Sequence, residues 1–209
     1  MKLYTPSKIQ RRLGERLFLK PERDLTQKSA MVRRPNPPGV HGRRSRRKPL
    51  SDYGAMLREK QKVRFSYLLT DTALRKYLRE ALSGGGLNPA EKLFSLLELR
   101  LDNILYRLGF ALSRLHARHL VSYGHAQVNG KPTRIPSRRL KPGDRVQIRG
   151  SSRTQPFFHE QAIRLKSYEP PSWLSLDRER WEGEVLRLPK FADETPSFDL
   201  DQVIAYYSR

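Results

Sequence analysis

The spacing of apolar residues between positions 100 and 148 predicts two short helices followed by a small sheet. The apolar residues from Leu101 to Leu108 recur at helical intervals and form one helix face. Gly109 follows at a position where a left-handed residue often ends a helix. Ser113 can cap a second helix, whose buried side runs from Ala117 to Gly124.

Turn residues indicate the sheet that follows these helices. Asn129-Gly130 lies between two short β-prone runs and predicts a tight type I′ hairpin. Pro142-Gly143-Asp144 predicts a second turn, after which Val146 and Ile148 alternate with polar residues as in a strand. The expected module has an apolar interior and many cations outside.

Upstream, the pattern changes to helices that carry more charge. Residues 51–69 predict a helix capped by Ser51 or Asp52, whose apolar period is blurred by cations on the same side. Residues 70–82 predict a cleaner amphipathic helix, with apolar positions from Leu74 to Ala81. A helical N-terminal domain is therefore expected.

Glycine and proline mark the irregular segments among the first 90 residues. Residues 1–50 are rich in both, lack a clear period and predict an extended basic arm. Gly84 to Gly86 predicts a flexible joint, and Asn88 should cap the helix after it. The expected fold class is α+β: a mainly helical N-terminal domain with an extended basic arm, plus the small αα-with-β-sheet module.

The C-terminal part gives weaker patterns. Residues from Pro156 to Tyr168 predict a short helix that Pro170-Pro171 breaks. The runs from Trp173 to Leu176 and from Gly183 to Leu188 predict a hairpin. Val203 to Tyr207 is interpreted as a terminal strand or extended segment because it is rich in β-branched and aromatic residues.

The net charge of the chain indicates which class of partner it binds. The 209 residues include 42 Lys and Arg against 21 Asp and Glu, a net charge of +21. Residues 1–64 carry 19 basic and 5 acidic side chains, whereas residues 168–209 carry 5 and 9. Such an excess attracts a polyanion. Because no apolar run is long enough to span a membrane, a nucleic acid is favoured and no membrane partner is expected.

Cations outside the module are candidate contacts for RNA phosphate. The arm would order against RNA, and the 51–69 helix would face it. The alternatives are a disordered tail or localisation signal, and a helix that is only solvated. Tyr53 is a candidate for stacking on an unpaired base, or for half-buried packing. The candidate cations outside the module are Arg11, Arg12, Arg43, Arg44, Arg46, Arg47, Lys48, Arg58, Lys60, Lys62 and Arg64.

Within the module, Arg100 and Arg107 share a polar helix face and are further candidates, as is Arg134 after the hairpin. Asp102 lies between the first two and is interpreted as their ion-pair partner, not as a catalytic group. No phosphate-binding loop or nucleophile motif is present. His116 and His119 are one helical turn apart, but no third ligand completes a metal site, so no cofactor or metal is expected.

The module also resembles a known RNA-binding domain. The segments that carry the resemblance are RLDN from Arg100, YRLGF from Tyr106, VNG from Val128 and KPGD from Lys141. They resemble the domain named after the small-subunit ribosomal protein four family, whose helices and hairpin face structured RNA. The resemblance implies RNA contacts at Arg114, Arg118, His119, Ser122, His125, Asn129 and Lys131.

Segments outside the module carry the resemblance further. GVHG from Gly39, LSDYG from Leu50 and LREKQK from Leu57 resemble the bacterial type of the same family. This implies a non-enzymatic, structural component of the small ribosomal subunit, in the cytoplasm or in a plastid. It also implies binding to small-subunit ribosomal RNA and to neighbouring ribosomal proteins, nucleation of assembly and an effect on decoding accuracy. In that setting, residues 43–48 would reach messenger RNA where it enters the subunit.

Two other functions stay open at this stage. The module also occurs in RNA-modifying enzymes, although residues 1–95 show no catalytic constellation. A free regulatory RNA binder would use the same cations. By the resemblance, four segments are expected: 1–50 as the arm, 51–97 as the helical N-terminal domain completed by 189–209, 98–167 as the RNA-binding domain, and 168–209 as a C-terminal hairpin and tail.

The chain has no cysteine, which excludes disulfides and cysteine-based zinc sites. The related family has a zinc-binding form with four cysteines near the N-terminus. The resemblance aligns those positions with Ser7, Gln10, Asp24 and Ser29, so this chain is the cysteine-free form. Our hypothesis is that hydrogen bonds formed within an assembled particle replace the metal.

Overall fold

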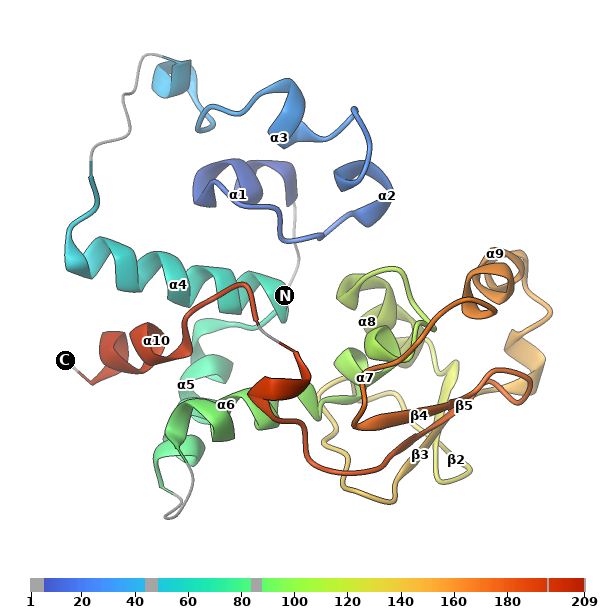
Figure 1. The fold of residues 1–209 in the computed structure, drawn as a ribbon. Coiled ribbons are helices and arrows are strands. Elements are labelled where there is room, and N and C mark those ends of the chain that lie inside the picture. The colour runs from blue at the N-terminus through green and yellow to red at the C-terminus, as the bar shows by residue number, and fades with distance from the viewer. Residues whose placement is uncertain (1–5, 44–48, 84–87, 195, 209) are drawn as a thin grey trace. The chain divides into compact units, whose positions relative to one another are not determined.

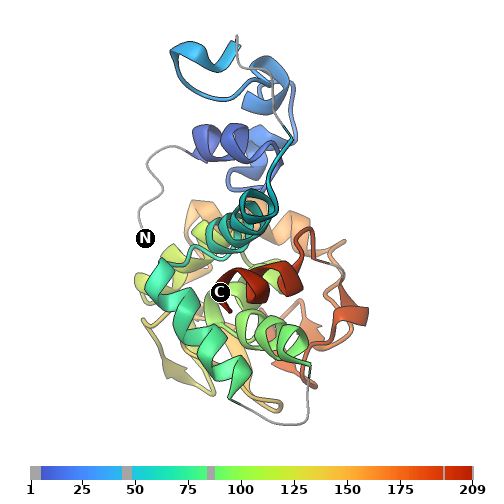
Figure 2. The same ribbon diagram turned by 90° about the vertical axis from the view of Figure 1, so that its left-hand side faces the viewer.

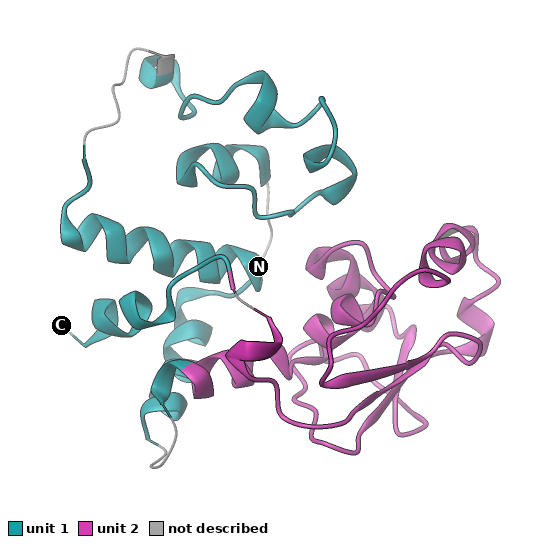
Figure 3. Cartoon of the chain, viewed as in Figure 1, with its two compact units in different colours: residues 1–90, 197–209 teal, residues 91–196 magenta. Residues whose placement is uncertain are grey.

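The computed structural model describes residues 6–43, 49–83, 88–194 and 196–208. The chain divides into two compact units, which Figure 3 colours separately: residues 1–90 with 197–209, and residues 91–196. In the described parts, the first unit is helical, and the second combines helices with one antiparallel sheet (Figure 1). The α+β class is therefore confirmed. No described helix is both long and apolar enough to cross a membrane.

The predicted helices of the first unit are present. Helix α4 (Asp52–Ser66) is capped by Ser51, whose side chain accepts a hydrogen bond from the Gly54 N–H. Helix α5 (Asp71–Leu82) is capped by Thr70 in the same way. The apolar side of α5 is buried, as its spacing predicts. Both helices begin where a side-chain oxygen satisfies a free backbone N–H group.

The C-terminal segment is a helix, so the predicted terminal strand is wrong. Helix α10 (Leu200–Tyr207) begins at Asp199, whose carboxylate accepts hydrogen bonds from two N–H groups of the first turn. Leu200 and Val203 are buried three residues apart, a helical spacing. Figures 1 and 2 show α10 alongside α4, so the C-terminal segment packs on a helix from the N-terminal half of the chain. The cap and this packing outweigh the strand preference of the aromatic and β-branched residues.

Residues 6–43 are more regular than the predicted extended arm. They form α1 (Pro6–Leu13), α2 (Pro21–Asp24), α3 (Ala30–Arg33) and the 3-10 turn η1 (Val40–Arg43). Proline begins α1 and α2, where its fixed φ favours a helix instead of blocking one. Leu13, Leu17 and Leu19 are buried, so this region contributes apolar side chains to the interior of the protein.

Helix α6 (Pro89–Glu98) runs from the first unit into the second, with Asn88 bonded to the Ala90 N–H. Helices α7 (Leu101–Arg107) and α8 (Arg114–Ser122) then pack against each other. Gly109 has a φ of +77° after α7, and Ser113 caps α8. Both predicted helix boundaries are confirmed.

The sheet of the second unit has strand order β2-β1-β3-β5-β4. Its strands are β1 (Ala126–Val128), β2 (Lys131–Pro132), β3 (Arg145–Ile148), β4 (Leu174–Asp177) and β5 (Glu182–Val185), all antiparallel to their neighbours. Asn129 and Gly130 have φ values of +51° and +76°, which a type I′ turn requires. Both predicted hairpins are confirmed.

The core of the second unit lies between α7, α8 and the sheet. At Gly183 in β5, an added Cβ would lie 2.4 Å from a methyl carbon of Leu108, so strand and helix approach as closely as a glycine permits. Helix α9 (Pro156–Leu165) adds Phe158, which packs edge-on against Trp181. Trp181 in turn stacks on Phe110. The buried side of α8 packs into the same core. Two 3-10 turns, η2 (Gly150–Ser152) and η3 (Phe191–Asp193), complete the unit.

Candidate nucleic-acid interface

A fully buried carboxylate organises the polar side of α7. Glu98 has no exposed surface, and its Oε2 accepts hydrogen bonds from Asn103 Nδ2 and Arg107 Nε, each at 2.8 Å. Arg107 Nη2 donates to the other oxygen at 3.0 Å, and Arg107 also pairs with Glu194. A buried charge is tolerated only when it is paired in this way.

A second buried carboxylate lies four residues further on. Asp102 receives two hydrogen bonds from Arg100, from Nε at 3.0 Å and from Nη2 at 2.6 Å. Arg118 Nη1 lies 3.9 Å from the same carboxylate. The interpretation of Asp102 as an ion-pair partner is confirmed for Arg100, whereas Arg107 pairs with Glu98 and Glu194 instead.

These carboxylates fix two arginines on one flank of α8. Arg114 donates from Nε to Asn103 Oδ1 at 2.7 Å, and its Nη2 lies 3.7 Å from Glu98. Its guanidinium carbon stands 4.7 Å from the centre of the Tyr106 ring. The side chains of Arg114 and Arg118 remain 18% and 29% exposed. Both therefore present charge to solvent from a fixed position.

Arg100 and Arg107 occupy a different place from the predicted surface. The side chain of Arg100 is 3% exposed and that of Arg107 is 13% exposed, and both are held by the carboxylates just described. Their guanidinium groups neutralise the buried carboxylates of Asp102 and Glu98. We assign them a positioning role and leave both out of the proposed RNA contacts.

The other candidates of the module lie at or near the surface. His119, Ser122, Lys131 and Arg134 are exposed. His125 is half-buried, with its Nδ1 2.9 Å from Ser152 Oγ.

Asn129 is exposed, but its side chain also secures the turn. Its Oδ1 accepts from the Arg145 N–H, and its Nδ2 donates to Asp144. Several exposed cations around the Pro142 turn were not among the predicted contacts, because the sequence there was interpreted only for its backbone geometry. They include Arg139, Lys141 and Arg149.

In the first unit, Lys60 and Lys62 on α4 are buried within the chain. Lys60 pairs with Asp71 and stands over the Tyr206 ring. Lys62 Nζ lies 2.6 Å from Glu59 and 2.5 Å from Glu15. Burial alone would lower the pKa of Lys62, but hydrogen bonds to these two carboxylates raise it. The predicted phosphate contacts at Lys60 and Lys62 are replaced by internal ion pairs, and we leave them out.

The remaining candidates of the first unit are more accessible. Arg12 is exposed, and Arg58 and Arg64 are half-buried. Arg11 donates from Nε to the carbonyl of Asn36 at 2.9 Å, which fixes its guanidinium group. Tyr53 is 51% exposed, with its hydroxyl 3.2 Å from that of Tyr206. The predicted contacts Arg43, Arg44, Arg46, Arg47 and Lys48 fall outside the side chains that the structure describes.

Asp71 links α5 to both α4 and α10. Burial would raise the pKa of this carboxyl group, but hydrogen bonds from Lys60 and Tyr207 lower it below its usual range. Burial and the hydrogen bond to Asp71 raise the pKa of the Tyr207 hydroxyl. Asp71 is therefore a charged anchor of the C-terminal helix at neutral pH.

The zinc-binding form of the related family does not fit this chain. Ser7 is exposed, and Ser29 is buried and caps α3 through its hydroxyl. Gln10 Nε2 donates to Asp24 Oδ2 at 2.8 Å, so this pair is joined by a hydrogen bond within the chain. One carboxylate, one amide and two hydroxyls are not a donor set that zinc uses. The bond between Gln10 and Asp24 lies within the chain and joins two of the four aligned positions. The hypothesis that bonds formed within an assembled particle hold the N-terminal region stays a prediction. Over the described chain, no three His, Cys, Asp or Glu residues gather as a metal site.

Comparison with known proteins identifies the family. The family model "Ribosomal protein S4/S9 N-terminal domain" matches residues 2–98, and the model "S4 domain" matches residues 99–146. The small ribosomal subunit protein uS4 of Thermus thermophilus is 44% identical over 199 residues, 95% of this chain and 94% of its own. The chain belongs to the uS4 family of small ribosomal subunit proteins. This is a family of structural ribosomal proteins, not of enzymes.

Relatives from distant bacteria support this assignment. The uS4 protein of Akkermansia muciniphila is 41% identical over 202 residues, 97% of this chain and 96% of its own. That of Dehalococcoides mccartyi is 42% identical over 199 residues, 95% of this chain and 94% of its own. The boundary between the two family models falls between residues 98 and 99, so Glu98 lies in the first model and the arginines that it pairs with lie in the second.

Proposed function

We propose that this protein is a structural constituent of the small ribosomal subunit that binds small-subunit ribosomal RNA directly. The observation that carries the proposal is the pair Arg114 and Arg118, which the buried carboxylates of Glu98 and Asp102 hold at the surface of α8. The family assignment supports it, because the relatives are named as small ribosomal subunit proteins.

The mechanism is electrostatic and needs no catalytic group. Guanidinium groups match phosphate geometry, and a group that is already fixed loses little side-chain entropy on binding. Binding releases counterions from the RNA, which makes affinity depend on salt. Contacts to phosphate and sugar should dominate over base reading. The proposed contacts in the described chain are Arg12, Tyr53, Arg58, Arg64, Arg114, Arg118, His119, Ser122, His125, Asn129, Lys131 and Arg134, together with Arg139, Lys141 and Arg149.

The finer roles follow from the family resemblance. We propose that the protein nucleates assembly of the subunit in the cytoplasm, touches neighbouring ribosomal proteins, contributes to decoding accuracy and lines the path by which messenger RNA enters. The cations around residues 43–48 would serve that last role.

Reconstitution of the subunit tests this proposal. Small-subunit ribosomal RNA is mixed with all small-subunit proteins, with and without this chain, and the particles are separated by sedimentation. We expect the chain to co-migrate with the particle, and its omission to leave several other proteins unbound. A complete particle without it would overturn the assembly role. A chain that stays at the top of the gradient would overturn the structural role.

A further inference from the structure

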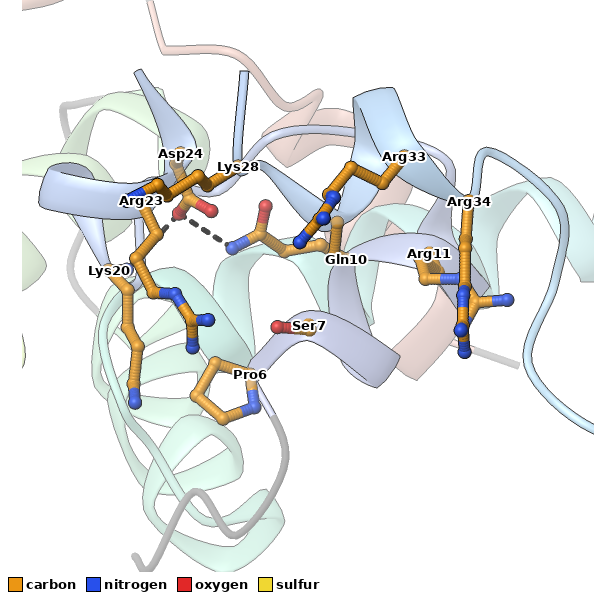
Figure 4. Close-up of a pocket in the computed structure, with 11 residues that line it drawn as sticks. Pro6, Ser7, Gln10, Arg11, Lys20, Arg23, Asp24, Lys28, Arg33 and Arg34 are labelled. Atoms are coloured by element: carbon orange, nitrogen blue, oxygen red, sulfur yellow. Dashed lines mark hydrogen bonds between the residues drawn. The ribbon is translucent and has the colours of Figure 1, made fainter. Parts of the chain in front are cut away.

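A cavity of about 450 Å³ opens between helices α1, α2 and α3 of the first unit (Figure 4). Its size lies within the range of small-ligand sites. Its lining is dominated by positive charge from all three helices and their connecting loops. The cations that line it are Arg11, Lys20, Arg23, Lys28, Arg33 and Arg34.

One carboxylate also lines the cavity, against six cations. Asp24 is buried, and its Oδ2 accepts from Gln10 Nε2 at 2.8 Å and from the Lys20 backbone N–H at 3.1 Å. Within the described part of the chain, no ion pair joins Asp24 to a lining cation. The cavity therefore keeps a strong positive surplus that suits an anion.

The cavity also holds an acceptor that lacks a partner. Gln10 is 1% exposed, and its Oε1 has no hydrogen-bond partner among the described atoms. Its amide orientation is set by Asp24, because only the NH₂ group can donate to a carboxylate. A buried acceptor without a partner is costly, so a ligand that carries a hydroxyl or amine donor would be stabilised here.

We propose that this cavity seats one ribose-phosphate unit of an RNA backbone. The phosphate lies among the cations, and the ribose 2′-hydroxyl donates to Gln10 Oε1. The 2′-hydroxyl is the group that distinguishes RNA from DNA, and RNA supplies both the anion and the donor. This inference rests on the proposed function and assigns a specific RNA contact to the N-terminal helices.

The first test removes charge from the cavity in the full-length protein. The variant R23A/R33A is compared with K76A/R79A, which removes the same charge from exposed positions on α5. Affinity for small-subunit ribosomal RNA is measured at several salt concentrations. We expect the cavity variant to bind more weakly than the control, with a salt slope shallower by about 1, because the contact to the one seated phosphate is lost. Equal behaviour of the two variants would overturn the proposal.

The second test addresses the 2′-hydroxyl. Small-subunit ribosomal RNA with scattered 2′-deoxy substitutions is selected for binding to the wild type and to Gln10→Met. The proposal requires at least one position where a deoxy sugar weakens binding to the wild type but not to the variant. An identical interference pattern would reject the assigned Gln10 contact. The charge test does not depend on Gln10→Met folding correctly.

The two proposals fail in distinguishable ways. If the wild type shows no preference for small-subunit ribosomal RNA over unrelated duplex RNA, the proposed function fails and this inference fails with it. If the wild type shows the preference while the cavity variant matches its control, only the cavity inference is overturned.

Discussion

The two units carry their positive charge in different ways. In the second unit, a hydrogen bond to Asn103 and an ion pair with the buried Glu98 fix Arg114. In the first unit, Arg23 and Arg33 are exposed at the cavity, and the only carboxylate among its described lining residues is held by an amide and a backbone N–H. The comparison indicates that Arg114 and Arg118 form a preset pattern of charge in the second unit. In the first unit, no carboxylate of the described chain pairs with Arg23 or Arg33 at the cavity.

The largest effect on stability should come from removing the charge of Glu98, which pairs with Arg107 and Arg114. Glu98→Gln removes the charge that balances Arg107 and Arg114 in a buried site. We expect the free energy of unfolding to fall by about 3 kcal/mol, because one partner of a buried pair is lost. Chemical denaturation measures this fall. Glu91→Gln, at an exposed position of the same helix, is the matched control and should change stability by less than about 0.5 kcal/mol. A comparable, small change in both variants would contradict the account.

The next effect tests the packing of the sheet against Leu108 in the core of the second unit. Gly183→Ala places a methyl group 2.4 Å from a methyl carbon of the buried Leu108 side chain, so this side chain or β5 must shift. We expect a loss of about 1–3 kcal/mol in unfolding free energy from overpacking.

Gly150→Ala is its control, because an added Cβ there meets nothing within 4 Å. If Gly183→Ala were as stable as Gly150→Ala, the close approach of strand and helix would not be a constraint.

A smaller effect is expected in the first unit. Tyr207→Phe deletes the hydroxyl that donates to Asp71 at 3.0 Å and so weakens the attachment of α10. We expect a loss of about 1 kcal/mol, typical of one hydrogen bond. Thermal unfolding can be compared with that of Tyr123→Phe, whose side chain is exposed. No difference between the two variants would show that the bond does not anchor the helix.

The smallest effect is a pH dependence that belongs to the first unit. The pKa of Asp71 is lower in the folded protein than its ordinary value of 3.8. A carboxyl group of this kind contributes stability above its unfolded pKa and loses that contribution as pH falls through its folded pKa. We therefore expect Asp71→Asn to reduce the acid-induced loss of stability below about pH 4, relative to the wild type. Parallel stability curves for the two proteins would argue against this charged anchor.

The sequence predicted local features well where one residue type decides the backbone. Asn129-Gly130, Ser113 and Gly109 marked their turn, cap and helix end correctly because each acts on its immediate neighbours. It failed where partners are distant in sequence. The aromatic run at the C-terminus was read as a strand, since its packing on α4 and the role of Asp199 as a cap depend on the folded chain.

The candidate interface shows the same limit. Spacing placed Arg114 and Arg118 on one flank of a helix, but it placed Arg100 and Arg107 at the surface as well. Only the fold reveals that Glu98 and Asp102 are buried and draw two of these four arginines inward. Sequence alone likewise gave no sign that Lys60 and Lys62 are neutralised by Asp71, Glu59 and Glu15.

The most direct test of the RNA-binding account is a competition experiment with the full-length protein. Small-subunit ribosomal RNA and an equal mass of unrelated duplex RNA compete for binding while the salt concentration is varied. With about ten phosphate contacts, we predict a clear preference for the ribosomal RNA and a slope of log affinity against log salt of roughly −7 to −9. Equal binding to both RNAs would contradict the account.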